Sequence, residues 1–377
     1  MRADDTGPRR SPRLWLLLGE KPGDNAQVLA LARALAEPFL VKRLIPRPEW
    51  ALGKPRFRPT LEHLDPARSD PLEPPWPDLV LTIGRRPSMA ALWLAERAAG
   101  RTRLVIVGRP KRWPERFALI VAPAQYAVPE AANVVRLELP LLGPDPERLR
   151  AAAERWGERF AGLARPLTAV LVGGETKPYR LDAGVAGRLA GELEALRARE
   201  GGTLWVTTSR RTAPPVAEAL EAALPPGTPF HRWRPDEPPD ANPYLGLLAL
   251  ADRFVVTGDS VSMLVEVARL GRPLAIFPLP VRADPATRLR RAIGRALAPE
   301  GSLAGLGALG RRLGLLGFPR ELERIHRLLI ESGRAVRLGE PFPPPGPPPP
   351  DELDRAVARL RVLLDEPAAQ AAPGRRL

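Results

Sequence analysis

Five polar clusters along this chain of 377 residues each follow a short apolar run, and their residue types suit the binding of a phosphorylated ligand. The most informative cluster is Thr257-Gly258-Asp259-Ser260, which stands between the apolar run Phe254–Thr257 and an apolar helical pattern. A strand, a small polar turn and a helix bring N–H groups and hydroxyls to a helix N-terminus, where the helix dipole favours an anion. The cluster therefore predicts a phosphate site, with an ordinary strand-to-helix crossover and a solvated turn as an equal alternative.

A single carboxylate, Glu266, stands in the helix that follows this turn. It comes six residues after Ser260, about one and a half helical turns, and Ser262 adds a hydroxyl near the same end. A carboxylate at that distance could accept a hydrogen bond from a ribose hydroxyl. We therefore interpret the segment as the nucleotide-sugar half of a glycosyltransferase-like site. The alternative is that Glu266 is buried and stabilises the fold through a hydrogen bond.

Two further clusters in the second half of the chain combine cations with glycines or hydroxyls. The paired glycines Gly173 and Gly174 would let the backbone approach a diphosphate, and Lys177 would add positive charge. The other cluster contains Ser209, Arg210, Arg211 and Thr212, whose hydroxyl and guanidinium groups suit bidentate phosphate contacts. A tight turn and a helix cap are the structural alternatives. No Gly-Lys-Ser/Thr follows the glycines, so this is not a P-loop.

The remaining two clusters lie in the first half of the chain and are assigned to an acceptor. In the segment Gly19–Gln27, the polar groups of Gly23, Asn25 and Gln27 could hold an acceptor substrate, and Asp24 is the predicted N-cap of a helix. The second cluster begins with Gly84-Arg85-Arg86. Two arginines at a helix start oppose the helix dipole unless an anion binds there, although a solvated face is an equal interpretation in so Arg-rich a chain.

Short apolar strands alternate with helical patterns along most of the chain, which predicts α/β domains with parallel sheets covered by helices on both faces. The predicted strands of the first half are Leu14–Leu18, Phe39–Ile45, Leu79–Ile83, Leu104–Val107 and Leu119–Val121. The second series comprises Thr168–Val172, Thr203–Thr207, Phe230–Trp233, Phe254–Thr257 and Leu274–Phe277. Two such series predict two facing Rossmann-like domains, in which ligands bind at the carboxyl ends of the strands.

The predicted boundaries follow composition. Residues 13–145 form an acceptor-side domain and residues 146–340 a nucleotide-sugar domain. The proline-rich stretch 341–350 can neither pair in a sheet nor continue a helix, so it is predicted to be an extended linker. Residues 351–377 contain an amphipathic helical pattern over Asp351–Asp365, followed by a tail.

Composition makes several classes of function unlikely candidates for this chain. It has no Cys and three His, so neither a metal nor another cofactor is expected. The formal net charge is +14, and arginines spread along the chain supply most of the positive charge. Such a surface could attract nucleotides or acidic lipid headgroups. Aromatic residues are not interleaved with the basic ones and no nucleic-acid module occurs, so nucleic acid is not expected as a partner.

The N-terminal region contains three arginines before the apolar run Leu14–Leu18, a pattern that resembles a signal peptide. The run is too short for the apolar core of such a peptide, and no stretch of the chain approaches about 18 consecutive apolar residues. We therefore expect a cytoplasmic protein that could touch the inner membrane peripherally.

Together the clusters resemble those of the elongated-mitochondria family, the fission proteins of plants and their bacterial homologues. The resemblance covers about residues 13–340. The matching segments are Gly19–Gln27, Gly84-Arg85-Arg86, Gly173-Gly174, Thr207–Thr212, Asn242-Pro243-Tyr244, Val256–Glu266, Gly271-Arg272-Pro273, and His326-Arg327-Leu328 with Gly333. The strings Ser209–Thr212 and Thr257–Met263 are the most specific of these.

This resemblance implies a GT-B-like bacterial protein whose second domain holds a nucleotide-diphosphate sugar, similar to the lipid-linked N-acetylglucosamine transferase of cell-wall synthesis. Our hypothesis for the activity is metal-independent glycosyl transfer to an envelope lipid or saccharide. Arg210, Arg211 and Lys177 would neutralise the leaving diphosphate, and Asp24 or Glu20 would act at the acceptor. Plant members are tied to recruiting a dynamin-like protein, so one alternative is a non-catalytic scaffold that binds a partner or a membrane surface. A nucleotide-sugar epimerase is the other, although the chain lacks a dinucleotide fingerprint and a Tyr-x-x-x-Lys pair.

Overall fold

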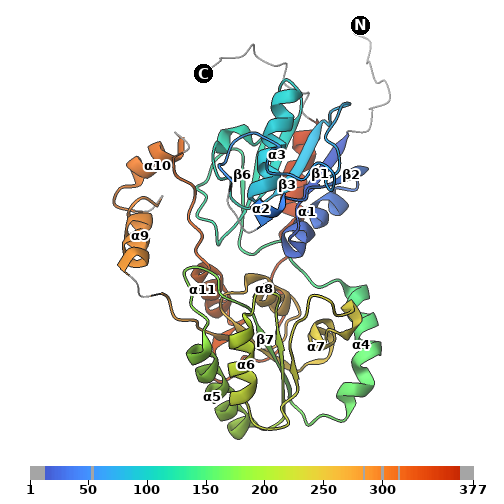
Figure 1. Cartoon of the computed structure of the whole chain (residues 1–377), viewed down its shortest axis with the longest axis vertical. Coiled ribbons are helices and arrows are strands. Elements are labelled where there is room, and N and C mark those ends of the chain that lie inside the picture. The colour runs from blue at the N-terminus through green and yellow to red at the C-terminus, as the bar shows by residue number, and fades with distance from the viewer. Residues whose placement is uncertain (1–12, 52–54, 283–284, 299–300, 313–314, 366–377) are drawn as a thin grey trace. The chain divides into compact units, whose positions relative to one another are not determined.

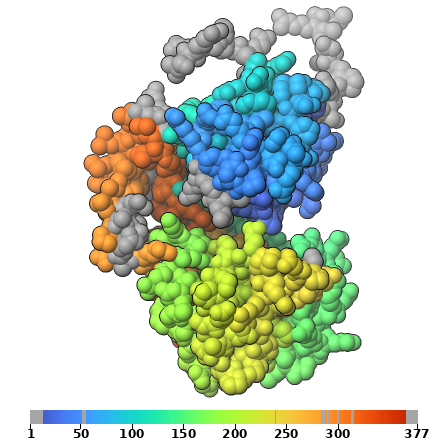
Figure 2. Space-filling model, in the orientation of Figure 1, coloured from blue at the N-terminus to red at the C-terminus, as the bar shows by residue number. Residues whose placement is uncertain are grey.

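The computed structural model describes residues 13–51, 55–282, 285–298, 301–312 and 315–365. The chain forms two compact units (Figures 1 and 2). Unit 1 comprises residues 1–141, 293–320 and 351–377, and unit 2 comprises residues 142–292 and 321–350. The chain thus leaves unit 1 twice, after residues 141 and 320, and returns to it twice.

Unit 1 is built on a six-stranded parallel sheet with the strand order β2-β1-β3-β4-β5-β6. Side chains alternate between the two faces of each strand, so both faces of this sheet must be covered. Leu14, Leu16 and Leu18 of β1 pack with helices α1 and α12, whereas Trp15 and Leu17 pack with α3. The strands are β1 (Leu14–Leu18), β2 (Phe39–Arg43), β3 (Leu79–Ile83), β4 (Arg103–Val107), β5 (Leu119–Pro123) and β6 (Val134–Leu137).

Unit 2 contains a second six-stranded parallel sheet, in the order β12-β11-β10-β7-β8-β9. Its central strands are buried along their whole length, as expected for a sheet covered on both faces. The strands are β7 (Leu167–Val172), β8 (Thr203–Thr208), β9 (Phe230–His231), β10 (Arg253–Thr257), β11 (Leu274–Phe277) and β12 (Val336–Arg337).

The helices connect and cover these strands. In the first part of the chain they are α1 (Pro22–Leu35), α2 (Pro48–Ala51), α3 (Arg85–Arg97) and α4 (Pro146–Ala161). In the second part they are α5 (Ala183–Glu200), α6 (Pro214–Ala223), α7 (Tyr244–Leu250), α8 (Val261–Arg269), α9 (Pro285–Ala296), α10 (Ala304–Arg312), α11 (Glu323–Glu331) and α12 (Leu353–Asp365).

Each sheet has one point at which its strand order reverses. In unit 1 this switch point lies between β1 and β3, and in unit 2 it lies between β7 and β10. The order in unit 2 is that of the doubly wound dinucleotide-binding fold, and unit 1 begins with the flavodoxin-like order. Ligands of such sheets bind outside the carboxyl ends of the strands at the switch point. Four of the five predicted clusters follow strands β1, β3, β7 and β10, which flank these two points.

The predicted fold class, α/β with two Rossmann-like parallel sheets, is confirmed. The short strands β6 and β12 were not predicted. The predicted N-cap at Asp24 is wrong, because α1 begins at Pro22 and Lys21 occupies the cap position. Proline is favoured in the first turn of a helix, which moves the helix start forward and places Asp24 inside that turn.

The C-terminal segments make specific contacts within the two units, and the predicted tail after Asp365 lies outside the described residues. The proline-rich stretch lies along unit 2, where the Gly346 N–H donates to the Gly271 carbonyl (3.0 Å) and Arg253 lies 4.8 Å from the Phe342 ring centroid. Helix α12 then packs against α1 with Leu360 fully buried. The carboxylate of Glu352 accepts from the Glu138 N–H at 2.6 Å, so residues after 350 are part of unit 1.

Candidate functional site

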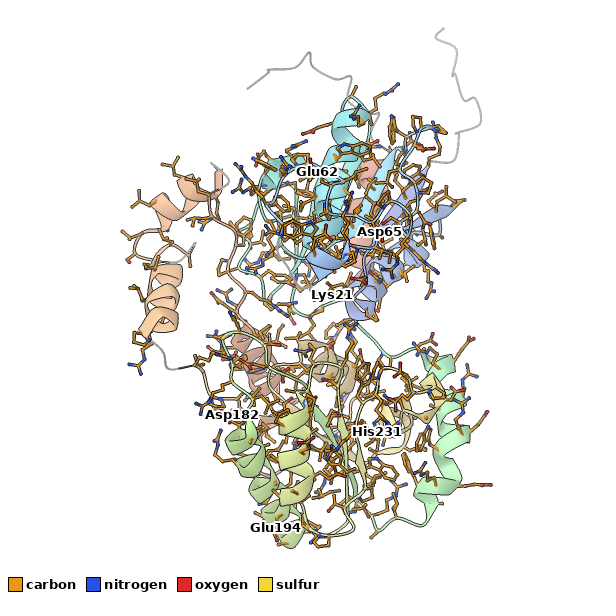
Figure 3. All side chains as sticks on the ribbon, in the orientation of Figure 1. Lys21, Glu62, Asp65, Asp182, Glu194 and His231 are labelled. Atoms are coloured by element: carbon orange, nitrogen blue, oxygen red, sulfur yellow. The ribbon has the colours of Figure 1, made fainter. Side chains whose placement is uncertain are left out.

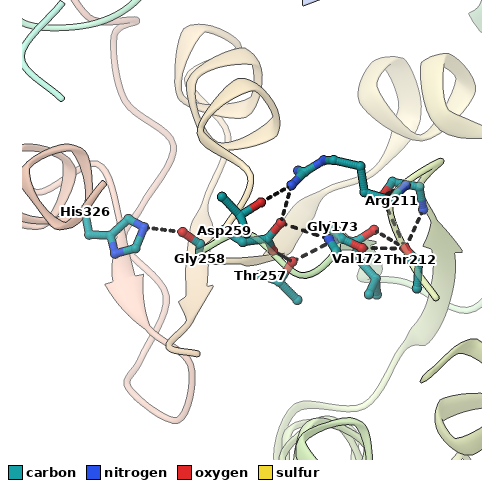
Figure 4. Close-up of polar contacts among 11 residues, drawn as sticks. Val172, Gly173, Arg211, Thr212, Thr257, Gly258, Asp259 and His326 are labelled. Carbon is teal, nitrogen blue, oxygen red and sulfur yellow. Dashed lines mark hydrogen bonds and ion pairs between the residues drawn. The ribbon is translucent and has the colours of Figure 1, made fainter. Parts of the chain in front are cut away.

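The switch point of unit 2 is closed by a hydrogen-bonded network between the loops that follow β7 and β10 (Figure 4). The Thr257 hydroxyl accepts from the Gly173 N–H and donates to Asp259 Oδ1, both at 2.8 Å. The second carboxylate oxygen of Asp259 accepts from the Gly174 N–H, also at 2.8 Å. Asp259 is 2% exposed, so a buried carboxylate forms the centre of this edge.

The loop after β8 supplies the cation of the network. Arg211 Nη1 lies 3.1 Å from Asp259 Oδ2, and the Arg211 side chain remains 41% exposed. Burial raises the pKa of Asp259, and the charge of Arg211 with the Gly174 N–H opposes that shift. Arg211 also donates to the Thr176 hydroxyl. Asp259 and Thr176 therefore hold the Arg211 guanidinium in position, while part of it remains open to solvent.

Thr212 ties the same loop to β7. Its hydroxyl donates to the Gly173 carbonyl and accepts from the Ser209 N–H at 2.9 Å. The neighbouring Arg210 is exposed, as is Lys177 in the loop after β7. All three predicted cations of the loops after β7 and β8 are thus exposed, and the predicted hydroxyls serve to hold these loops.

The paired glycines are required by this packing. A Cβ at Gly173 would lie 2.3 Å from Asp259 Oδ2, and a Cβ at Gly174 would lie 2.0 Å from the Arg211 carbonyl oxygen. Their N–H groups are bonded to Thr257 and Asp259. In this arrangement the glycine N–H groups serve contacts within the protein, and the approach of this backbone to a diphosphate stays a prediction.

Helix α8 begins at Val261, two residues after Asp259. Ser260 is its N-cap residue and makes no side-chain cap, and Ser262 lies half-buried in the first turn. The Gly258 carbonyl accepts a hydrogen bond from His326 Nε2 of α11 at 2.6 Å, which assigns the proton to that nitrogen (Figure 4). The Asp259 carboxylate therefore supplies negative charge next to the α8 N-terminus, where the helix dipole favours it.

Glu266 lies on α8 and is paired with a tyrosine. The Tyr244 hydroxyl donates to Glu266 Oε2 at 2.5 Å. Burial raises the pKa of Glu266, while this hydrogen bond and the charge of Arg148 lower it. Burial, together with Glu266, raises the pKa of Tyr244 well above its ordinary value. Within the part of the chain that the structure describes, Glu266 Oε1 accepts no hydrogen bond, so one oxygen remains for a ligand hydroxyl.

Behind Tyr244 lies a polar chain that sequence reasoning missed. Figure 3 labels His231 in unit 2. Its Nε2 lies 2.8 Å from Glu237 Oε2, and its Nδ1 lies 3.1 Å from the Thr207 hydroxyl. The amide of Asn242 donates to Glu237 Oε1 and accepts from the Tyr244 N–H, each at 3.0 Å. The string Asn242-Pro243-Tyr244 matched the family pattern in the sequence, but no function was assigned to it there. This series of hydrogen bonds fixes the start of α7 and the position of Tyr244, which donates to Glu266.

The switch point of unit 1 brings the loops after β1 and β3 together. A Cβ at Gly19 would lie 3.4 Å from the Pro87 side chain, and a Cβ at Gly84 would lie 3.7 Å from Asp24 Oδ2. Burial raises the pKa of Asp24, and the charges of Lys21, 3.9 Å away, and Arg320 oppose the shift. Asp24 is thus a half-buried carboxylate at the point where this fold binds ligands.

The other predicted acceptor-side residues of this loop make local contacts. Asn25 donates through its side chain to the Gly19 carbonyl at 2.7 Å. The Gln27 amide donates to the Gly23 carbonyl at 3.5 Å, and Glu20 is exposed. Asn25 and Gln27 therefore stabilise the turn into α1, and Asp24 and Glu20 are the carboxylates left near the edge.

Arginines gather beside this edge of unit 1. Arg85 donates through Nη2 and Nε to the Pro55 carbonyl at 2.6 and 3.2 Å and lies 5.5 Å from the Phe57 ring centroid. Arg86 donates to the Trp50 carbonyl. Burial, and then the charges of Arg112 and Arg86, lower the pKa of Arg85.

Two more arginines of this region were not predicted. Arg109 donates to the Phe318 carbonyl, and burial followed by the charge of Arg320 lowers its pKa. Arg112 lies 5.9 Å from the Trp113 ring centroid. Among the described residues, Arg85, Arg109 and Arg112 form no ion pair with a carboxylate. Arg112 repels Arg85, and Arg320 repels Arg109. An anion bound beside them would relieve that repulsion.

In the described ranges no group of three or more His, Asp or Glu side chains is arranged to hold a metal ion. None of the helices found there is both long enough and apolar enough to cross a bilayer.

The chain is similar to several solved structures at low identity. It is 13% identical to S. aureus MnaA in a co-structure with UDP, over 94% of this chain and 97% of that one, with a TM-score of 0.48. It is 13% identical to UDP-GlcNAc 2-epimerase of Neisseria meningitidis, over 94% and 100% of the two chains, with a TM-score of 0.48. The spinosyn forosaminyltransferase SpnP is 15% identical over 94% and 100%, with a TM-score of 0.42. These likenesses concern general architecture.

Sequence comparison identifies the family. The chain is 29% identical over 222 residues to mitochondrial fission protein ELM1 of Arabidopsis thaliana, covering 53% of this chain, and it spans about half (51%) of that relative's length. It is 22% identical over 299 residues to an uncharacterized protein of Rickettsia prowazekii, covering 70% of this chain and 82% of that protein. The family model for mitochondrial fission ELM1 matches residues 22–299, and the chain therefore belongs to that family.

Proposed function

We propose that this protein is a glycosyltransferase that takes a nucleotide-diphosphate sugar as donor and an envelope lipid or saccharide as acceptor, without a metal ion. The observation that carries the proposal is the Arg211 guanidinium, anchored by buried Asp259 at the switch point of unit 2 yet open to solvent. Such an anchored cation is pre-organised for a diphosphate, because little rotamer freedom is lost when the anion binds.

The donor would be held by α8 and the loops around it. Arg210, Arg211 and Lys177 would neutralise the diphosphate, and Glu266 Oε1 would accept from a ribose hydroxyl while Tyr244 holds the other oxygen. During transfer an acceptor oxygen forms a bond to the anomeric carbon, and the bond from that carbon to the diphosphate oxygen breaks. The electron pair leaves with the diphosphate, where fixed cations stabilise the developing charge.

The acceptor would be held by unit 1. Asp24 would accept the proton of the acceptor hydroxyl, because its raised pKa makes it a stronger base than an ordinary aspartate. The uncompensated arginines near Arg85 favour an acceptor that carries a negative charge, such as a phosphate. We further propose that the protein works in the cytoplasm at the inner face of a membrane.

The experiment is calorimetric titration of the full chain with UDP, GDP, CMP and their sugar conjugates, with and without Mg²⁺. One nucleotide is expected to bind in both conditions, and Glu266→Gln is expected to weaken it about tenfold, since a hydrogen bond to a charged group contributes about 1.5 kcal/mol. Glu192→Gln is the matched control, because Glu192 is another half-buried glutamate whose pKa burial raises.

A second candidate is a non-catalytic scaffold that binds a partner protein. The family's description, which names mitochondrial fission, favours it, as does the use of the glycine N–H groups within the protein. Absence of binding for every nucleotide tested would establish this candidate over the first. Equal loss of affinity in Glu266→Gln and Glu192→Gln would show that any binding site lies elsewhere.

A further inference from the structure

Residues 285–315 carry most of the large aliphatic side chains that the described chain exposes. Six of these nine side chains fall there: Leu289 (62% exposed), Ile293 (49%), Leu303 (48%), Leu306 (61%), Leu309 (52%) and Leu315 (72%). Leu40, Val41 and Val362 are the other three. Singly scattered apolar side chains are normal on a protein surface, but such a concentration marks an interaction site.

Four of these side chains lie on α9 and α10, and Leu303 and Leu315 flank α10. The segment 285–315, drawn in orange in Figures 1 and 2, is called the α9–α10 hairpin below. The Leu303 N–H donates to the Ala296 carbonyl at 2.8 Å, which closes the turn between the helices. Arg311 of α10 donates to the Leu297 carbonyl at 2.8 Å and is 7% exposed. A buried arginine therefore fixes α10 against the end of α9.

Glycines allow the two helices to approach. A Cβ at Gly307 would lie 2.0 Å from the Leu297 carbonyl oxygen, and a Cβ at Gly301 would lie 2.1 Å from the Arg295 carbonyl oxygen. The sequence thus supplies a buried cation and two glycines to build a hairpin that leaves its leucines outside. Poor packing is not the reason for their exposure.

The hairpin is also strongly basic. Residues 285–312 contain six arginines and one acid, Glu300, and α9 itself contains four arginines and no acid. Leu289 and Ile293 are four residues apart and share one face of α9. Arg288 and Arg295, both exposed, are seven residues apart and share another face. A helix with arginines beside an exposed apolar face is suited to lie in a membrane interface.

We propose that the α9–α10 hairpin binds the surface of a membrane that contains anionic lipids, with Leu289, Ile293 and Leu306 inserted at the level of the acyl chains. Arg288 and Arg295 contact the phosphate headgroups. Charge complementarity selects this occupant over a second copy of the chain, because two molecules of formal charge +14 repel each other.

The test is flotation of the full chain with vesicles of phosphatidylcholine alone or mixed equally with phosphatidylglycerol. The protein is expected to float with the anionic vesicles, and Leu289→Ser combined with Ile293→Ser is expected to lower the ratio of bound to free protein about tenfold or more. Leu40→Ser with Val41→Ser is the matched control, because these exposed side chains (58% and 36%) lie on β2, and it is expected to float like the parent.

Arg288→Gln with Arg295→Gln is expected to weaken binding to anionic vesicles alone and to reduce its dependence on salt. The proposal is overturned if the hairpin and β2 variants float equally well. It is also overturned if the parent does not float and sedimentation shows instead that the parent is a dimer, which the hairpin substitutions dissociate. No nucleotide is present in this assay, so its result is independent of donor binding, and each proposal can fail alone.

Discussion

The two switch points lie in sheets of different strand order, and they differ in how the charges of their arginines are compensated. In unit 2 the buried Asp259 compensates Arg211, and the backbone of the glycine pair is bonded and crowded on every side. In unit 1, Arg85 and Arg112 are held by a carbonyl and by aromatic rings and have no carboxylate partner in the described chain. At the first edge the solvent-exposed guanidinium has a buried carboxylate partner, whereas at the second edge the arginines have none among the described residues.

The largest expected effect tests whether the edge of unit 2 is closed. Gly174→Ala should destabilise the protein by about 3 kcal/mol, because the new methyl group meets the Arg211 backbone and overpacking costs this much. Gly187→Ala in α5 is the control: nothing lies within 4 Å of its Cβ, and the protein should gain about 0.5–1 kcal/mol. Urea unfolding midpoints measure both.

The corresponding glycine of unit 1 makes the comparison direct. Gly19→Ala places its methyl group at an ordinary contact distance of 3.4 Å from Pro87 and should change stability by less than about 0.5 kcal/mol. If Gly19→Ala and Gly174→Ala were equally destabilising, the two edges would be equally closed and the contrast would be lost.

The next effect concerns Tyr244→Phe, which removes the hydrogen bond to Glu266. Donor affinity should fall about fivefold to tenfold, since a bond to a charged group contributes about 1–1.5 kcal/mol. The pKa of Glu266 should rise further, because this bond lowers it. Titration calorimetry at several pH values would show donor binding lost at a higher pH in the variant; identical profiles would remove Tyr244 from the site.

Asp24 gives a pH-dependent prediction. Burial raises its pKa, so between the ordinary value of 3.8 and the folded value the native chain holds a proton that the unfolded chain has released. Its contribution to stability therefore falls as pH rises through that interval. Asp24→Asn should raise stability at pH 7 by up to about 1 kcal/mol, because partial exposure screens the effect, and the gain should vanish below the unfolded pKa.

Asp252→Asn in unit 2 is the matched control with the opposite sign. Burial alone would raise the pKa of Asp252, but the hydrogen bonds from Arg165 and the Leu167 N–H lower it. This variant should lose stability at pH 7 and approach the parent in acid. Melting curves from pH 3 to pH 7 would decide both cases, and a gain in Asp252→Asn would contradict the assignment.

The smallest effect tests the repulsion among the arginines of unit 1. Arg112→Gln should leave stability unchanged or raise it by about 0.3 kcal/mol at low salt, and 0.5 M NaCl should remove the difference. Arg101→Gln, which alters an exposed arginine bonded to the Ala98 carbonyl, serves as control. A loss of stability in Arg112→Gln alone would show that its charge is compensated.

The fold followed from the sequence because the central strands are apolar along their whole length. The predicted strand Leu14–Leu18 has the observed bounds of β1, and the same holds for β3. The strands that were missed, β6 and β12, are short edge strands with exposed arginines at positions 136 and 337, so their pattern is weak.

The site was less predictable, because residue types do not reveal what a polar group already bonds. Asn25 matched a ligand-binding pattern but donates to its own turn. Arg109 and Arg112 could not be distinguished from the many other arginines of the chain until the fold placed Arg112 near Arg85 and Arg109 near Arg320. His231 and Glu237 lie six residues apart in an irregular segment, and only the tertiary structure pairs them.

The placement of α12 has a consequence for synthesis of the chain. Ala356, Val357 and Leu360 complete the core on one face of the first sheet, so the unit whose strands emerge first from the ribosome is the last to be finished. Until residue 360 has left the ribosome, the apolar side chains of α1 and β1 that pack with α12 stay exposed to solvent. Unit 2 can complete its core earlier, and a prematurely terminated product would expose an aggregation-prone sheet face.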